Sequence, residues 1–233
     1  MDDGELVLPS AGPDPISLDV ALAAVLGYAR GRRPLFFRAP NVRTGRWVEI
    51  PAFGYARFDA RPRGQGPLGE PDVLTAEGLH GRLDPGAWAQ VKQALQDAGP
   101  ILDGAAERAA GRALWELPDD EFSVLAEPGT VGAFLRQVED PHVAAALHHR
   151  RPELVPLLAR ATRWQLLPHV REGDSGPPAV IFRELRANAA AFTRLEAELA
   201  SEDVPLTRLR LHDVLLWLTA TLRLPSAVAL GRR

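Results

Sequence analysis

The sequence of 233 residues contains no cysteine, a single lysine and no long apolar run. The absence of cysteine excludes disulfides, iron–sulfur sites, thiolate nucleophiles and zinc sites built on sulfur. The richest apolar stretches, residues 20–26 and 214–224, are shorter than the roughly 20 residues that a membrane-spanning helix needs. The first five residues are acidic where a secretory signal would be positive. We therefore expect a cytoplasmic protein with no membrane partner.

Charge is nearly balanced, but its basic part is almost entirely arginine. Lysine and arginine total 27 against 30 acidic residues, which gives a net charge of −3. This excludes a strongly basic coat of the kind that covers many nucleic-acid-binding proteins, although a local basic face stays open. Hydrophobic residues make up 46% and charged residues 24%, which is typical of a folded globular chain.

Apolar periodicity and helix start signals predict a mainly α, compact single domain with about eight or nine helices. Ser17 is expected to cap the first helix, and Asp84-Pro85 to open another, because these residue types favour helix N-termini. The expected helices include residues 18–30, 85–97, 100–116, 181–200 and, as the last, 207–223.

One small β-hairpin is expected among residues 34–59. Leu35-Phe36-Phe37 and Trp47-Val48-Glu49-Ile50 are aromatic and β-branched, and they flank a turn-rich connection. A loop rich in proline and glycine follows. We expect an irregular N-terminal arm over 1–15, a region of helix, hairpin and loop over 16–71, and a helical body over 72–233 that forms one domain with it.

The most basic stretch lies in the middle third of the chain. Arginines with a nearby aromatic ring suit phosphate contact and base stacking. The predicted nucleic-acid-binding residues of this stretch are His148, His149, Arg150, Arg151, Arg160, Arg163, Trp164 and Arg171. The same arginines fit an internal network of ion pairs with the acids at 116–121 and 139–140. The spacing of the histidines does not suit a metal, and we expect no metal and no cofactor.

Two glycines add a second possible phosphate contact. Gly129 and Gly132 leave backbone amides open just before an expected helix, and a helix N-terminus binds phosphate readily. A plain turn between helices explains the same residues.

Asp213 is the candidate catalytic acid, because it stands in the otherwise apolar stretch 209–218. A carboxylate in such surroundings either has a perturbed pKa and a chemical role or pairs with an arginine and fixes helix packing. The acidic residues at 119–121 are the other candidates.

Four short segments follow one another in a recognisable order. They are Gly54-Tyr55-Ala56-Arg57-Phe58-Asp59, Asp72-Val73-Leu74-Thr75-Ala76-Glu77-Gly78-Leu79, Arg150-Arg151-Pro152-Glu153-Leu154-Val155-Pro156 and Leu209-Arg210-Leu211-His212-Asp213-Val214-Leu215-Leu216-Trp217. Together they resemble an uncharacterised family of high-GC bacteria whose pattern is similar to that of helix-hairpin-helix DNA glycosylases. The resemblance spans about residues 54–220 and implies an all-helical body without a settled activity.

The resemblance also implies positions for two catalytic residues, a lysine and a carboxylate that acts at the sugar. This sequence has Ala145 and Ala159 there. Alanine can neither activate water nor stabilise an oxocarbenium-like centre. We therefore expect a catalytically degenerate glycosylase-like protein that binds nucleic acid. The alternatives are an enzyme of unknown reaction that uses Asp213 or another carboxylate, and a protein-interaction or structural module. The oligomeric state is left open.

Overall fold

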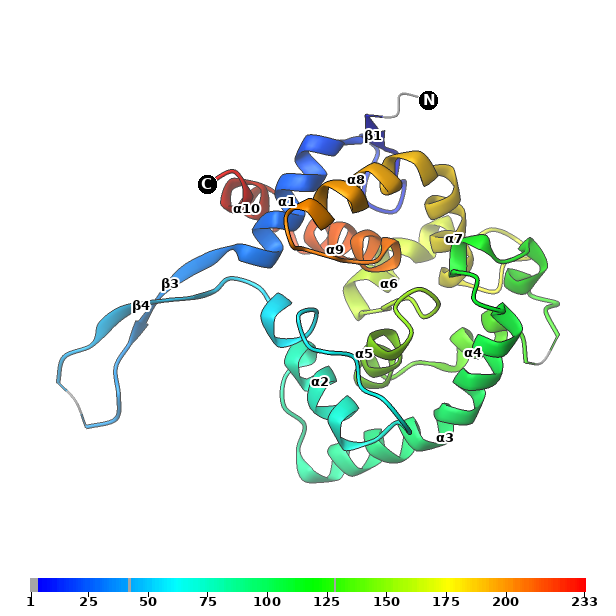
Figure 1. Ribbon diagram of the computed structural model, residues 1–233, viewed down its shortest axis with the longest axis horizontal. Helices are drawn as coiled ribbons and strands as arrows, with labels where there is room; N and C mark the ends of the chain where they lie inside the picture. Colours follow the sequence, from blue (N-terminus) through cyan, green and yellow to red (C-terminus); the bar gives the residue numbers. More distant parts are fainter. Residues whose placement is uncertain (1–3, 42, 128) are drawn as a thin grey trace.

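The computed structural model describes residues 4–41, 43–127 and 129–233, and most of them are helical (Figure 1). In this described part the α-helices are α1 (Leu18–Arg30), α2 (Glu70–His80), α3 (Pro85–Ala109), α4 (Val131–Gln137), α5 (Pro141–Arg150), α6 (Arg160–Leu166), α7 (Pro177–Ala187), α8 (Ala189–Ser201), α9 (Arg208–Ala220) and α10 (Leu224–Gly231). The short 3-10 helices are η1 (Tyr55–Arg57), η2 (Leu114–Glu116), η3 (Asp119–Phe122) and η4 (Leu167–His169). The strands are β1 (Glu5–Leu6), β2 (Ile16–Ser17), β3 (Arg32–Phe37) and β4 (Arg46–Pro51). The mainly α fold predicted from the sequence is confirmed.

Side-chain caps explain where several helices begin. The Ser17 hydroxyl accepts a hydrogen bond from the Val20 amide at 3.4 Å. The Asp84 carboxylate accepts from the amides of Gly86 and Ala87 at 2.9 Å each. An oxygen at this position satisfies amides that have no partner within the helix. The predicted starts of α1 and α3 are therefore confirmed.

The predicted helix boundaries are wrong in two stretches. α3 continues through Pro100 to Ala109 and does not end near residue 97. The stretch 181–200 is not continuous, because Asn188 separates α7 from α8. The Asn188 side chain accepts from the Val7 amide at 2.7 Å and donates to the Val7 carbonyl at 2.8 Å. This contact between residues far apart in the sequence leaves no trace in the local periodicity.

The N-terminal segment packs onto the helices instead of forming an irregular arm. β1 pairs with β2, and Leu6 is fully buried. The Ser10 hydroxyl donates to Glu184 Oε2 at 2.6 Å, and the same oxygen lies 2.7 Å from His212 Nε2. Burial opposes ionisation of Glu184, but the bonds from His212 and Ser10 lower its pKa below the ordinary value. This buried contact joins the segment to α7 and α9.

One hydrophobic cluster runs through the described residues from Leu6 to Ala227, with α9 almost entirely buried. α1 and α10 approach each other closely at two glycines. A Cβ on Gly27 would lie 1.8 Å from the Ala227 carbonyl oxygen, and one on Gly231 would lie 1.9 Å from the Ala23 carbonyl oxygen. Only a residue without a side chain permits this separation.

The predicted hairpin is a two-stranded ribbon that stands away from the helices (Figure 1). β3 and β4 pair in register from Arg32 opposite Pro51 to Phe37 opposite Arg46. The rings of Phe36 and Trp47 meet across the strands with their centroids 5.4 Å apart, and such cross-strand pairs stabilise a ribbon. Every residue of β3 is exposed. We call residues 32–51 the arm.

Candidate functional site

The fold removes both histidines from the predicted basic interface. His148 is only 2% exposed and His149 is also buried. His148 Nδ1 lies 2.6 Å from the Val155 carbonyl oxygen, and His149 Nε2 lies 3.2 Å from the Arg61 carbonyl oxygen. Burial lowers the pKa of His148 to about 4, so this side chain is neutral at pH 7. Neither histidine presents a cation to a polyanion.

Arg150 and Arg151 are held by acids of the protein. Arg150 Nε lies 2.5 Å from Asp72 Oδ1 and Nη2 lies 2.8 Å from Oδ2, which is a two-point contact with a buried carboxylate. Arg150 also donates to the Gly66 carbonyl at 2.8 Å and so holds the loop that leads into α2. Arg151 lies 3.8 Å from Asp103 in an exposed pair. The alternative of internal ion pairs is therefore correct for Arg150, although its partner is not one of the acids expected.

The other side chains of the predicted interface reach the surface. Arg160 and Arg171 are exposed, Arg163 is half-buried, and Trp164 is 65% exposed. Within the part of the chain that the structure describes, no carboxylate forms an ion pair with Arg160 or Arg163. α6 thus offers two cations and an indole ring to solvent, a combination that suits phosphate contact and stacking.

A carboxylate of the protein occupies the position predicted for a phosphate at α4. Glu121 Oε2 accepts from the Val131 amide at 2.9 Å, and its Oε1 pairs with Arg108 at 2.9 Å. Gly132 is buried, and a Cβ there would lie 2.1 Å from the Glu121 carbonyl oxygen. Gly129 is exposed with a φ of +90°, a turn conformation that favours glycine. Both glycines therefore serve packing and chain reversal.

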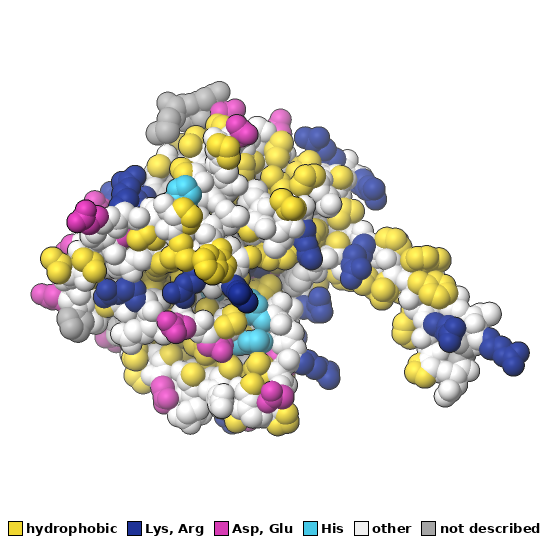
Figure 2. All heavy atoms as spheres, turned by 180° about the vertical axis from the view of Figure 1, so that it is seen from behind, with side chains coloured by type: hydrophobic (Ala, Val, Ile, Leu, Met, Phe, Trp, Pro, Cys, Tyr) yellow, Lys and Arg dark blue, Asp and Glu magenta, His cyan; other side chains and the backbone are white. Residues whose placement is uncertain are grey.

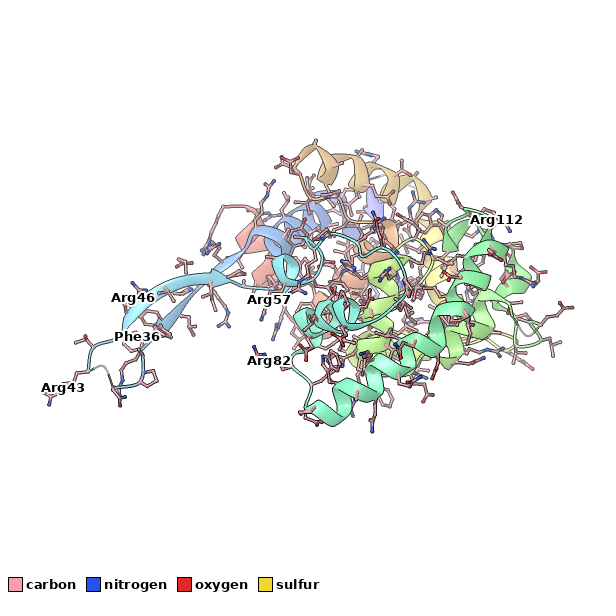
Figure 3. The ribbon with its side chains drawn as sticks, turned by 60° about the horizontal axis from the view of Figure 1, so that its bottom comes forward. Phe36, Arg43, Arg46, Arg57, Arg82 and Arg112 are labelled. Atoms are coloured by element: carbon pink, nitrogen blue, oxygen red, sulfur yellow. The ribbon has the colours of Figure 1, made fainter. Side chains whose placement is uncertain are left out.

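The arm concentrates positive charge. Residues 32–51 contain five arginines and one acid, Glu49, so the arm carries 5 − 1 = +4 and the rest of the chain −3 − 4 = −7. Figure 3 shows Arg43 and Arg46 beside Phe36 on the arm, Arg57 at its root and Arg82 on the adjoining body. Figure 2 shows basic and apolar side chains along the arm from the opposite side.

Large aromatic side chains of the arm are exposed to solvent. Trp47 is 69% exposed, and Phe36 and Phe37 are about half exposed. Contiguous exposed apolar residues mark interaction surfaces more often than isolated ones do. The sequence predicted the hairpin but not the exposure of these rings, because strand residues of this type normally pack one face of a sheet against a core.

A cavity of about 340 Å³ lies where the arm joins the body. Arg33 lines it from the start of the arm and Phe53 from the segment just after the arm. His80 lines it from the end of α2, and Asp213 and Trp217 line it from α9. The cavity thus joins segments that are far apart in the sequence, which no local motif could indicate.

Arg210 forms one wall of this cavity and is bound by three neighbouring side chains. Its Nε lies 2.6 Å from Asp59 Oδ1, its Nη2 lies 2.6 Å from the Tyr28 hydroxyl, and its Nη1 donates to Asp213. The Tyr28 hydroxyl donates in turn to Asp59 at 2.7 Å. Burial opposes the charge of Arg210, but Asp59, Tyr28 and Asp213 hold its pKa well above the ordinary value.

Asp213 combines the two roles that the sequence left open. It pairs with Arg210, as a packing residue would, and it also lines the cavity. Its Oδ1 is buried without a hydrogen-bond partner. Burial raises the pKa of Asp213 from 3.8 to about 6. Asp213 is therefore a structural carboxylate that lines the cavity and has one buried, unsatisfied acceptor oxygen.

The two alanines at the expected catalytic positions lie in different surroundings. Ala145 is fully buried on α5. Ala159 lines the same cavity as Asp213. The carboxylate that the resemblance implies at Ala159 is therefore missing from the wall of a cavity that receives a carboxylate from α9.

Comparisons with known proteins give no independent guide to function. No family model, curated protein or solved structure matches this chain. Among the described residues, no single helix has both the length and the hydropathy to cross a membrane. α9 and α10 meet that criterion only as a pair, and the chain bends by 119° between them.

Proposed function

We propose that this protein binds nucleic acid through its arm, with Arg160, Arg163 and Trp164 of α6 as a second contact. The observation that carries the proposal is the exposed ribbon with a charge of +4 on a remainder of −7. A basic element on an acidic body directs a polyanion to one place, because the body repels what the arm attracts.

The shape of the arm suits a nucleic-acid groove. A two-stranded ribbon fits the major groove of a DNA duplex. The pairing of Arg32 with Pro51 and of Arg33 with Ile50 places these two arginines on opposite faces of the ribbon, since successive side chains of a strand alternate. An element inside a groove lies between two phosphate backbones, so arginines on both of its faces can contact phosphates.

The same alternation argues against a lipid surface as the partner. An interfacial element separates an apolar face from a charged face. On the arm, Arg33 shares a face with Leu35 and Phe37, whereas Arg32 shares the other with Phe36. Neither face is free of charge, so insertion into a bilayer would bury arginine.

The proposal includes no glycosylase chemistry, because Ala145 and Ala159 supply neither a lysine nor a carboxylate. We also propose that the protein resides in the cytoplasm, as expected from its sequence. An enzyme that uses Asp213 is the second candidate, favoured by the place of this residue in the cavity lining and by its buried Oδ1 without a partner.

The test is fluorescence anisotropy with a short labelled DNA duplex at two salt concentrations. If four arm arginines contact phosphates, a slope of about −0.9 per contact gives about −3.6, and affinity falls about 150-fold between 50 and 200 mM salt. The double variant Arg43→Ala/Arg46→Ala removes two contacts, so its affinity should fall only about 12-fold over the same range.

Arg136→Glu is the matched control, since it changes the net charge by the same two units from α4, on the side of the molecule away from the arm (Figure 1). It should leave both affinity and salt dependence close to those of the unmodified protein. No binding at about 50 mM salt would overturn the proposal. Equal losses in the arm variant and the control would also do so, as would binding to anionic lipid vesicles in preference to DNA.

A further inference from the structure

The cavity at the root of the arm has an aromatic wall. Tyr28, Phe53 and Trp217 contact one another, with ring centroids 5.6 to 6.5 Å apart. All three line the cavity. Its volume of about 340 Å³ lies within the range of small-molecule sites. Aromatic walls favour a flat apolar ligand, because rings stack offset or edge to face.

The cavity also has an excess of cations. Arg33, Arg57 and Arg223 line it, and among the described residues none of them forms an ion pair with a carboxylate. The Arg223 guanidinium lies 5.1 Å from the centre of the Trp217 ring. Among the described residues that line the cavity, Asp213 is the one carboxylate, and it is already paired with Arg210. Guanidinium groups bind carboxylate and phosphate through two parallel hydrogen bonds, so this lining selects an anion.

Two buried polar atoms of the lining residues have no partner. Asp213 is only 4% exposed, and its Oδ1 accepts no hydrogen bond. His80 Nε2 is likewise without a partner. A buried polar atom left unsatisfied destabilises the folded protein. A ligand that donates a hydrogen bond to Asp213 would remove this penalty in the bound state.

From these three features we infer that the cavity binds a planar aromatic molecule that carries an anionic group and a ring N–H or O–H donor. The ring lies along Tyr28, Phe53 and Trp217. The anionic group meets the free arginines, and the donor meets Asp213 Oδ1. A mononucleotide and a hydroxylated aromatic carboxylate both have this chemistry. The inference does not depend on nucleic-acid binding by the arm.

Isothermal titration calorimetry with four probes tests the inference. Guanosine 5′-monophosphate and 4-hydroxybenzoate represent the two sources, whereas guanosine and inorganic phosphate each carry half of the required chemistry. We expect at least one aromatic anion to bind with one site per chain and a Kd below about 1 mM. Guanosine and phosphate should each bind at least about tenfold more weakly. The aromatic anion that binds with the lower Kd shows whether the ligand is a mononucleotide or a hydroxylated aromatic carboxylate.

Variants locate the site. Arg57→Ala removes an exposed arginine of the cavity lining. This variant should raise the Kd of the probe about tenfold or more. Arg136→Ala is the control at a distant exposed arginine and should have no effect. The arm variant Arg43→Ala/Arg46→Ala should keep probe binding while it loses DNA binding, so failure of one proposal is distinguishable from failure of the other. The inference is overturned if neither aromatic anion binds, if phosphate alone binds equally well, or if Arg57→Ala binds as the unmodified protein does.

Discussion

Asp59 and Asp213 both flank Arg210, but neutralising one or the other should have different effects on the free energy of unfolding. Asp59 accepts two hydrogen bonds from the guanidinium and one from Tyr28, whereas Asp213 accepts one and leaves Oδ1 unpartnered. The side chains of Asp59, Arg210 and Asp213 are all at most 5% exposed. With both carboxylates ionised the cluster carries a net −1, so one carboxylate is sufficient to balance Arg210.

The variant Asp59→Asn removes the principal partner of a buried cation. Loss of one member of a buried pair typically destabilises a protein by about 3–5 kcal/mol. For a chain of this length each kcal/mol lowers Tm by about 2–4 °C, so a decrease of about 6–20 °C is expected.

The variant Asp213→Asn should behave differently with pH. The pKa of Asp213 rises from 3.8 to about 6 on folding, so its stabilising contribution is present below the unfolded pKa and is lost as pH rises through about 6. The difference corresponds to about 3 kcal/mol at 1.36 kcal/mol per pKa unit. Asparagine keeps an acceptor for Arg210 and does not titrate. Relative to Asp213→Asn, the unmodified protein should therefore lose about 2–3 kcal/mol of its free energy of unfolding between about pH 4 and about pH 7.

Urea unfolding followed by tryptophan fluorescence measures both effects, because Trp217 lies beside the cluster. The free energy of unfolding is compared for the three proteins across the pH range. A constant difference between Asp213→Asn and the unmodified protein at all pH values would refute the reasoning. So would an Asp59→Asn variant that is as stable as Asp213→Asn at neutral pH.

Four further predictions concern packing, exposure and one buried hydrogen bond. Gly27→Ala should destabilise the protein by about 1–3 kcal/mol in urea, because its Cβ meets backbone. Gly104→Ala, with open space in α3, should stabilise by about 0.5–1 kcal/mol. Trp47→Ala should lower the free energy of unfolding by less than about 1 kcal/mol, since it removes only an exposed cross-strand pair. It should weaken the binding of single-stranded DNA in anisotropy titrations by about 1–3 kcal/mol if a base stacks on the indole ring. Ser10→Ala should lower stability in urea by about 1 kcal/mol, since Glu184 loses a buried donor.

Local sequence signals were sufficient to predict where several helices begin, but not which distant segments contact those helices. Ser17 and Asp84 indicated helix starts because a cap acts within three residues. The break at Asn188 could not be predicted, because its cause is a hydrogen bond to Val7 from the other end of the chain. The additional helix α10 was not predicted, because this short helix after Arg223 begins without a side-chain cap.

The same distinction applies to the candidate site. The sequence pointed to Asp213 as a candidate catalytic acid, because a charged residue within an apolar stretch is unusual. His148 and Arg150 were assigned to a surface, because sequence alone does not show which side of a basic helix is turned inward. The arm was recognised as a hairpin, but its projection from the body and the cavity at its root depend on how Arg33, Phe53 and α9 meet in three dimensions.

The contact between α1 and α10 also sets an order for folding during synthesis. Gly27 and Ala227 are 227 − 27 = 200 positions apart, which a ribosome takes about 10–40 s to translate at 5–20 residues per second. Throughout that interval α1 lacks the helix that packs against it. Chaperone protection of the emerging chain is therefore most valuable before α10 leaves the exit tunnel.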